Sequence, residues 1–438
     1  MLIEFRVANY TVFREMVTLS AEPGAYLTKY KTTNIWADRH FPVLKNLLLF
    51  GPNGAGKTRL LKGLSLMQTM ILNGGSKAIS DRLPYAPFKF DDQSGQQPTV
   101  LGIRLSQAGR AYDYSFTYDE QKIISEKLTE VLVTKERVYF ERQGDQLIVA
   151  PPRIKRLLPR LRPNALLLYL AQQENDPVAG AVFTWFAKNL LIHFNRVVAI
   201  PVQMIELVKQ PAVRKELVSF MHFADFNIHD VVVREVPVEL PPAVAELLRS
   251  ANELPELPPQ TQPALFTVHK RYNQAGELIG TEELPLAEES LGTQQLFMAT
   301  LATLYAQLNQ NETTIVVDEF GSSLHPRLTA ALVRLFNSAE NHNQYVLAAH
   351  DFNLLDQRVR TDQIYLVEKD FTGVSELKSV FDFVDARQGG RTDVKFAKKY
   401  MAGHYGAVPV IDEDELEMAL KEANLELGGA ECHENHGV

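Results

Sequence analysis

A glycine-rich loop at residues 51–58 constrains this chain more than any other stretch of its sequence. It reads Gly-Pro-Asn-Gly-Ala-Gly-Lys-Thr and follows the apolar run 47–50, which has the length and apolarity of a buried parallel strand. After the loop, apolar residues recur at helical spacing until Gly74 and Gly75 end the segment. A strand, a glycine loop and a helix in this order are the context in which such a loop binds phosphate.

The residue types of this loop indicate how it would bind phosphate. Glycines let successive backbone N–H groups point at an anion, with the positive end of the helix dipole behind them. We expect Lys57 to reach the β- and γ-phosphates and to act in catalysis, and the Thr58 hydroxyl to ligate Mg²⁺. The alternative, a glycine-rich turn with a solvated lysine, is disfavoured by both flanks. The residues expected to hold a nucleoside triphosphate are Gly51, Pro52, Asn53, Gly54, Ala55, Gly56, Lys57 and Thr58.

Composition narrows the class of protein. With 438 residues, 45% of them hydrophobic, the chain is long enough for more than one core. A net charge of −8 argues against a surface made for nucleic acid, so DNA stays open as a partner that the charge does not indicate. No apolar stretch approaches the roughly 20 residues of a membrane span and no signal peptide is present, so we expect a cytoplasmic protein with no membrane partner.

Cys432, the single cysteine, lies near His433 and His436, but a polar chain end is a simpler interpretation than a metal site.

Four regions are expected along the chain. Residues 1–150 carry a strand hairpin, the glycine loop and an antiparallel meander. Residues 151–283 are predicted to be a mainly helical insertion, and residues 284–411 return to alternating strands and helices, before an acidic tail at 412–438. The strands of the meander are predicted at 101–105, 111–118, 123–133, 137–142 and 146–149.

A basic cluster opens the predicted insertion. It is a candidate patch for phosphate or nucleic acid, although a solvated helix face is the favoured interpretation. Its members are Arg153, Lys155, Arg156, Arg160 and Arg162.

Two later strands end in polar residues that suit a nucleotide site. The β-branched run 313–317 delivers Asp318 and Glu319 at its carboxyl end, the edge where open α/β sheets place ligands. We expect Asp318 to hold the metal through water and Glu319 to act as general base toward an attacking water. The apolar strand 345–348 ends near His350, which could hydrogen-bond the γ-phosphate and join the catalytic residues. An acidic turn and a structural histidine are the alternatives.

A shorter motif precedes the predicted helix 297–308. Ser290 is placed to cap that helix, and Gly292 would let a phosphate approach its amino end. Ser290, Gly292 and Thr293 are therefore counted among the nucleotide-binding residues. A simple helix cap would explain the same residues.

The order of these pieces resembles ABC-type ATPases of the SMC and RecF branch. In that branch the phosphate loop comes early, and a signature segment, an acidic strand and a switch histidine come late. The matching pieces are Gly51–Thr58, Ser290–Gln294, Asp318-Glu319 with the following loop 322–326, and His350, and residues 5–13 resemble the branch's first strand. The resemblance implies an α/β P-loop NTPase with a split head, ATP with Mg²⁺ as ligands, and two chains that sandwich two ATP molecules.

Two features depart from that branch. The signature reads Ser-Leu-Gly-Thr-Gln rather than Ser-Gly-Gly-Gln, and Gln93, Gln96 and Gln97 are equal candidates for the lid glutamine. The choice of ATP over GTP also follows from the resemblance alone, since no base-reading residue is identifiable.

Several stretches are similar to a narrower group, the AAA-type ATP-binding proteins of bacterial abortive-infection and anti-phage systems, which includes the ATPase of the PARIS defence system. They are residues 87–90, 224–228, 289–293 and 400–409. This resemblance implies an ATPase switch that forms a homodimer or higher oligomer and holds or activates a separately encoded nuclease or toxin. The stretch after His350 is too short for a nuclease domain of about 100 residues or more.

The alternative function is a RecF- or SMC-like ATPase that repairs or clamps DNA. It predicts a basic groove and hydrolysis stimulated by DNA. A transporter subunit is disfavoured by the split layout and the unusual signature.

Overall fold

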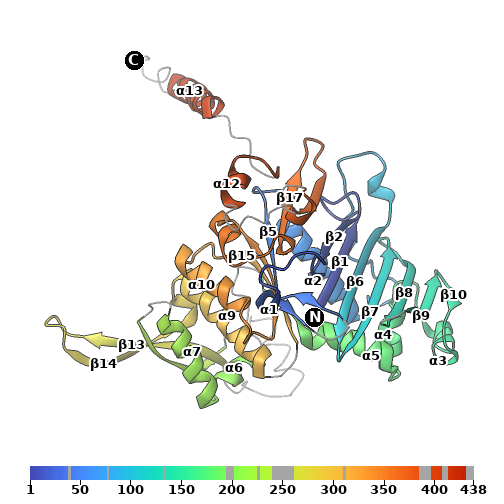
Figure 1. Cartoon of the computed structure of the whole chain (residues 1–438), viewed down its shortest axis with the longest axis horizontal. Helices are drawn as coiled ribbons and strands as arrows, with labels where there is room; N and C mark the ends of the chain where they lie inside the picture. Colours follow the sequence, from blue (N-terminus) through green and yellow to red (C-terminus); the bar gives the residue numbers. More distant parts are fainter. Residues whose placement is uncertain are drawn as a thin grey trace, which may run out of the picture.

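Two large sheets and the helices around them make up the fold (Figure 1). The computed structural model describes residues 1–37, 41–75, 78–132, 135–193, 202–223, 227–238, 261–308, 312–383, 396–406 and 413–430. The α/β class predicted from the sequence is confirmed. Nothing in the described ranges forms a helix long and apolar enough to cross a membrane.

The central sheet has six strands in the order β11-β15-β16-β5-β17-β18. All neighbours pair in parallel except β17 and β18, which are antiparallel. β5, from the first part of the chain, lies between β16 and β17, from the last part, so the predicted split of the head is confirmed. The strands are β5 (Asn46–Phe50), β11 (Leu190–His193), β15 (Thr314–Phe320), β16 (Gln344–Ala349), β17 (Ile364–Lys369) and β18 (Ser375–Ser379).

The second sheet is antiparallel and contains the predicted meander. Its seven strands run in the order β10-β9-β8-β7-β6-β1-β2, and the β1–β2 hairpin is as expected. They are β1 (Leu2–Ala8), β2 (Val17–Ser20), β6 (Thr99–Gln107), β7 (Arg110–Tyr118), β8 (Ile123–Val131), β9 (Glu136–Gln143) and β10 (Gln146–Val149). A further pair, β3 (Ile35–Trp36) and β4 (Val43–Leu44), forms a two-stranded sheet.

Side chains of β5 alternate between two apolar cores. Leu47 and Leu49 join a core with the buried face of α2 (Lys57–Asn73) and with strands of the antiparallel sheet. Leu48 and Phe50 join a second core with α9 (Leu291–Leu308) and α10 (Pro326–Phe336) on the other face of the central sheet. Successive side chains of a strand point to opposite faces of the sheet. A strand that is buried on both faces therefore needs the continuous apolar run that the sequence has here.

A glutamine links the two large sheets. Gln344, at the start of β16, donates its side-chain amide to the carbonyl oxygens of Leu2 (2.8 Å) and Leu44 (3.0 Å). Its Oε1 accepts from the backbone N–H of Leu2 (2.8 Å). Because these groups are buried, the bonds fix the start of β1 against the central sheet.

The region predicted to be mainly helical, 151–283, contains more strand than expected. β11 lies within it and pairs with β15 in the central sheet, and β12, β13 and β14 form a three-stranded sheet. The β-branched run 231–233 of β12 is the sequence signal for this sheet. The strands are β12 (Ile228–Pro237), β13 (Thr261–Tyr272) and β14 (Leu278–Pro285).

Helices cover the central sheet and connect the strands. The remaining α-helices are α1 (Lys31–Asn34), α3 (Pro152–Lys155), α4 (Leu167–Gln173), α5 (Pro177–Thr184), α6 (Val202–Val208), α7 (Pro211–Phe223), α12 (Phe396–Met401) and α13 (Glu413–Ala430). The short helical turns are η1 (Ser94–Gln96), η2 (Leu158–Arg160), η3 (Trp185–Asn189), η4 (Leu286–Glu288), η5 (Phe352–Asp356), η6 (Thr361–Gln363) and η7 (Val380–Asp382). Cys432, His433, His436, most of the stretch 224–228 and the end of 400–409 lie outside the described residues.

Candidate nucleotide site

The glycine loop connects the end of β5 to the first turn of α2, as the sequence predicts. At Gly51 a Cβ atom would lie 2.2 Å from the carbonyl oxygen of Val367 on β17, so no side chain fits there. Gly56 caps α2 with a φ of +119°, a conformation that residues with a side chain rarely adopt. The two glycines therefore let the loop turn tightly at the edge of the sheet and leave the first N–H groups of α2 available to an anion.

Lys57 is folded back over the loop. Its side chain is 6% exposed, and its Nζ donates to the carbonyl oxygens of Gly51 (2.6 Å) and Pro52 (3.1 Å). Burial lowers the pKa of Lys57 to about 8, and the carboxylates of Asp318 and Glu319 partly offset that effect. The ammonium is thus a poorly hydrated cation held by neutral carbonyls, which a phosphate could replace with a charge-assisted partner.

The other residues of the loop differ in their exposure to solvent. Asn53 and Gly54 are exposed, Pro52 and Thr58 are half-buried, and Ala55 is buried. The outer part of the loop is therefore accessible to a ligand.

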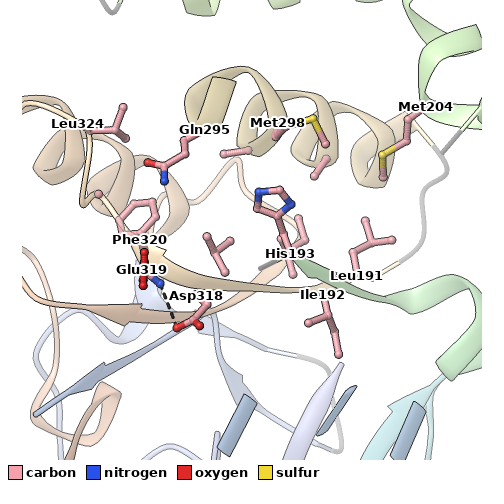
Figure 2. A pocket seen from close by; sticks show the side chains of 15 residues that line it. Leu191, Ile192, His193, Met204, Gln295, Met298, Asp318, Glu319, Phe320 and Leu324 are labelled. Carbon is pink, nitrogen blue, oxygen red and sulfur yellow. Dashed lines mark hydrogen bonds between the residues drawn. The ribbon is translucent and has the colours of Figure 1, made fainter. Parts of the chain in front are cut away.

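Asp318 and Glu319 stand at the carboxyl end of β15. Asp318 is 7% exposed and accepts a hydrogen bond from the backbone N–H of Glu319 (3.1 Å), drawn in Figure 2. Glu319 is exposed and has a φ of +51°, a left-handed conformation that costs a residue with a side chain on the order of 1 kcal/mol. Strained backbone of this kind is often found at functional sites.

His350 follows the last residue of β16, and it is exposed. Although the residue reaches the surface, partial burial of its ring and the charge of Lys57 lower the pKa of His350, while Glu319 and Asp318 act in the opposite direction. The ring is therefore neutral at pH 7 and can accept or donate a hydrogen bond.

The strand order explains why these groups meet. β15, β16 and β5 are adjacent and parallel, so their carboxyl ends lie on one edge of the sheet. Across this edge the carboxylates of Asp318 and Glu319 act to raise the pKa of both Lys57 and His350, and the charge of Lys57 helps to lower the pKa of His350. The Thr58 hydroxyl and the Asp318 carboxylate are oxygen ligands of the kind Mg²⁺ prefers, so the donor set fits a magnesium nucleotide.

Ser290 and Thr293 hydrogen-bond to each other and not to the residues of this group. Helix α9 begins at Leu291, earlier than expected, and Ser290 is its exposed N-terminal cap. Within the described chain, the Ser290 hydroxyl bonds only to Thr293, by accepting from its N–H (3.2 Å) and by pairing with its hydroxyl (2.8 Å).

Gly292 has a packing role that the sequence did not reveal. A Cβ at this position would lie 2.5 Å from the carbonyl oxygen of Ser323, in the loop that follows Glu319. The glycine thus lets the start of α9 pack directly on that loop. A phosphate need not be invoked to explain a glycine here.

A mostly apolar cavity of about 220 Å³ lies between α9 and the strands β11 and β15 (Figure 2). Met298 and Gln295 of α9 line one wall, and Ile315 and Val317 of β15 line the other. Glu319 is at one end of the cavity, while His193, whose pKa is lowered by burial, lies along it. The underside of α9 is therefore not fully packed on the sheet.

Two further expectations concern residues outside this group. Among the described residues, Gln93 and Gln97 take part in hydrogen bonds with side chains through their backbone atoms, and these contacts single out none of the three candidate lid glutamines, Gln93, Gln96 and Gln97. In the basic cluster, Arg153 pairs with Asp176 (2.7 Å) and Arg160 pairs with Glu174 (2.8 Å). These ion pairs favour the interpretation of that cluster as a solvated surface.

The chain has an α/β fold, a glycine loop after a central parallel strand, and an Asp-Glu pair at the end of a nearby strand. This is the architecture of an AAA- or ABC-type nucleotide-binding domain. The chain matches the family described as "AAA domain, putative AbiEii toxin, Type IV TA system" over residues 47–356. The match spans more than half of the chain, which therefore belongs to this family.

Distant likenesses to solved structures accompany the family match. An SMC head domain from Thermotoga maritima is 12% identical with a TM-score of 0.37, covering 86% of this chain and 98% of that chain. An SMC head bound to the C-winged helix domain of ScpA is 11% identical with a TM-score of 0.42, covering 86% and 97%. At these scores neither likeness carries an argument about function. No curated protein matches the chain.

The lowered pKa of Lys57 predicts a pH dependence of ATP binding. Phosphate charge raises the pKa of a bound lysine, so binding takes up a proton wherever free Lys57 is deprotonated. Affinity is then full below the free pKa of about 8 and falls above it. We expect the Kd to rise toward a limit of about tenfold per pH unit above that value, measured by calorimetry at pH 7 to 9.5 in buffers of different ionisation enthalpy.

Lys57→Arg is the control for this effect, because arginine stays protonated throughout the range. Its Kd should change much less with pH than that of the unmodified protein. A Kd for the unmodified protein that is constant from pH 7 to 9.5 would contradict the assignment of Lys57 to the phosphates.

Proposed function

We propose that this chain is an ATP-binding and ATP-hydrolysing switch of a bacterial anti-phage, abortive-infection system. Mg²⁺·ATP binds at residues 51–58, with Thr58 and Asp318 toward the metal, Lys57 and His350 toward the phosphates, and Glu319 as general base. Two chains close around two ATP molecules, and Ser290 of one chain faces the γ-phosphate on the other. Opening and closing of this pair holds or activates a separately encoded nuclease or toxin.

The observation that carries this proposal is the meeting of four groups from distant parts of the chain. Lys57, Asp318, Glu319 and His350 lie at the carboxyl ends of three adjacent parallel strands, and the two carboxylates act on the pKa values of Lys57 and His350. Phosphoryl transfer to water requires groups of this kind. Here they are the buried ammonium of Lys57, the buried carboxylate of Asp318, and the exposed side chains of Glu319 and His350. The exposed position of Ser290 supports a role toward a second chain rather than its own.

Family membership supports the role in defence. The description of the family names a toxin and a toxin–antitoxin system. An ATPase of such a system acts through an effector, and a place in the PARIS group would make that effector a nuclease. The regions 1–150, 151–283, 284–411 and 412–438 remain the proposed division of the chain.

Phage challenge of the intact locus tests the defence role. Cells that carry this gene with its neighbours should plate phage less efficiently than cells without it, and Lys57→Ala in the same locus should restore plating, because the switch then binds ATP much more weakly. Lys62→Ala, an exposed lysine on the same helix, serves as the matched control. Three results together would favour DNA repair or clamping instead. They are a place for the gene in a replication operon, ATP hydrolysis that DNA stimulates, and no effect of the locus on phage plating.

A further inference from the structure

A small sheet lies directly before the segment that carries Ser290. β12 packs on α7, where Ile228 and Val231 join the same apolar core as Leu217 and Met221. The β13–β14 hairpin projects from the body of the molecule (Figure 1). β14 leads through the single turn η4 into Glu289 and then Ser290. Any displacement of this sheet is therefore passed along a very short connection to the start of α9.

The side chain of Glu289 fastens that connection to the sheet. Its Oε1 accepts a hydrogen bond from the Thr267 hydroxyl (2.5 Å) and lies 2.6 Å from Nε2 of His269, both on β13. Thr267 is fully buried and the Glu289 side chain is 10% exposed. A carboxylate removed this far from water stays in place only while such donors satisfy it, so the contact is specific rather than incidental.

The backbone of Glu289 is held from the other side by α9. Gln294, in the first turn of that helix, donates its side-chain amide to the carbonyl oxygens of Glu289 (2.8 Å) and Ala287 (3.1 Å). Glu289 therefore joins the sheet through its side chain and the helix through its carbonyl. Ser290 is the next residue, so both sets of bonds determine where its hydroxyl lies.

The packing beneath α9 is incomplete, so the hydrogen bonds of Glu289 and Gln294 contribute to the position of its first turn. The cavity between α9 and the strands β11 and β15 removes contacts that would otherwise fix the helix on the sheet (Figure 2). The close approach of Gly292 to the Ser323 carbonyl sets the depth of the first turn.

We propose that Glu289 is a positioning residue: by binding Thr267 and His269 it couples the β12–β14 sheet to Ser290 and holds Ser290 where it completes the nucleotide site of a second chain. This inference rests on the proposed function, because it assumes that Ser290 acts on a partner's ATP. Glu289 itself touches no nucleotide. Its effect should therefore appear in association and turnover and not in the affinity of a single chain for ATP.

The test uses full-length variants. Glu289→Ala should lower kcat by about ten- to a hundredfold, the range caused by small misplacements of catalytic groups. In a Glu319→Gln background it should weaken ATP-driven association by a similar factor, while the Kd for ATP stays within about twofold. Glu289→Gln keeps an acceptor oxygen for Thr267 and His269, so it should restore most of the activity. Glu282→Ala is the matched control, since it removes an exposed acid that pairs with Arg271 on the same sheet.

The outcomes separate this inference from the function on which it rests. If the unmodified protein neither associates with ATP nor hydrolyses it, the proposed function fails and this inference fails with it. If it does both, and Glu289→Ala does so equally well, only the coupling is overturned. If Glu289→Ala does not fold, His269→Ala, which removes one donor from a partly exposed position, decides the question by the same measurements.

Discussion

Replacing Lys57 with alanine is expected to weaken ATP binding strongly. The Lys57 ammonium hydrogen-bonds to the carbonyl oxygens of the turn formed by Gly51 and Pro52. A charge-assisted bond to phosphate in a partly buried site contributes about 1.5–3 kcal/mol, so its loss should raise the Kd by about ten- to a hundredfold. Fluorescent-nucleotide titration or calorimetry measures this directly.

The unfolding temperature of Lys57→Ala distinguishes loss of the binding site from loss of the fold. The pKa of Lys57 in the folded chain, about 8, is below its usual value, so its charge costs stability at neutral pH, and that cost disappears only as pH rises through the two values. Lys57→Ala should therefore keep or raise the unfolding temperature while it weakens ATP binding. Lys62→Ala, on the exposed face of α2, should leave both unchanged. An unaltered ATP affinity in Lys57→Ala would remove the nucleotide site from residues 51–58.

Much of the fold could be predicted because its signals are local. The apolar run before residue 51 and the helical spacing after it are short-range patterns, and the structure places β5 and α2 there. The β-branched run that ends at Asp318 forms β15, and the strands of the meander lie within a few residues of their expected bounds. The carboxyl-end rule for parallel strands then brings Lys57, Asp318 and His350 to one edge.

Features that depend on tertiary pairing could not be predicted in this way. β11 is only four residues long and is a strand because β15 lies beside it, which overrides the helical pattern around it. The bond between Glu289 and His269 depends on the register of β13 against β14, which no local pattern specifies. The positive φ of Glu319 likewise has no signal in residue type, since glutamate rarely adopts it.

Replacing Glu319 with glutamine is expected to trap an ATP-bound dimer. Glutamine has nearly the same shape, so the backbone at this strained position need not change, but its amide cannot take a proton from water. Loss of a general base lowers the hydrolysis rate by about a hundred- to ten-thousandfold, and ATP then persists in the site. The substitution also removes a negative charge that would face the γ-phosphate, which favours binding further. Light scattering after gel filtration, in ATP and in ADP, shows the association, and phosphate release shows the rate.

The control and a second substitution make this experiment decisive for the role of Ser290. Glu340→Gln, at an exposed acid, should behave as the unmodified chain. Adding Ser290→Arg to Glu319→Gln places a bulky cation where the two chains would meet, so the ATP-dependent dimer should be lost while each chain still binds ATP. A Glu319→Gln protein that stays monomeric in ATP and hydrolyses it at the normal rate would contradict both the general base and the sandwich. A dimer that survives Ser290→Arg would keep the ATPase but move the contact between chains to another surface.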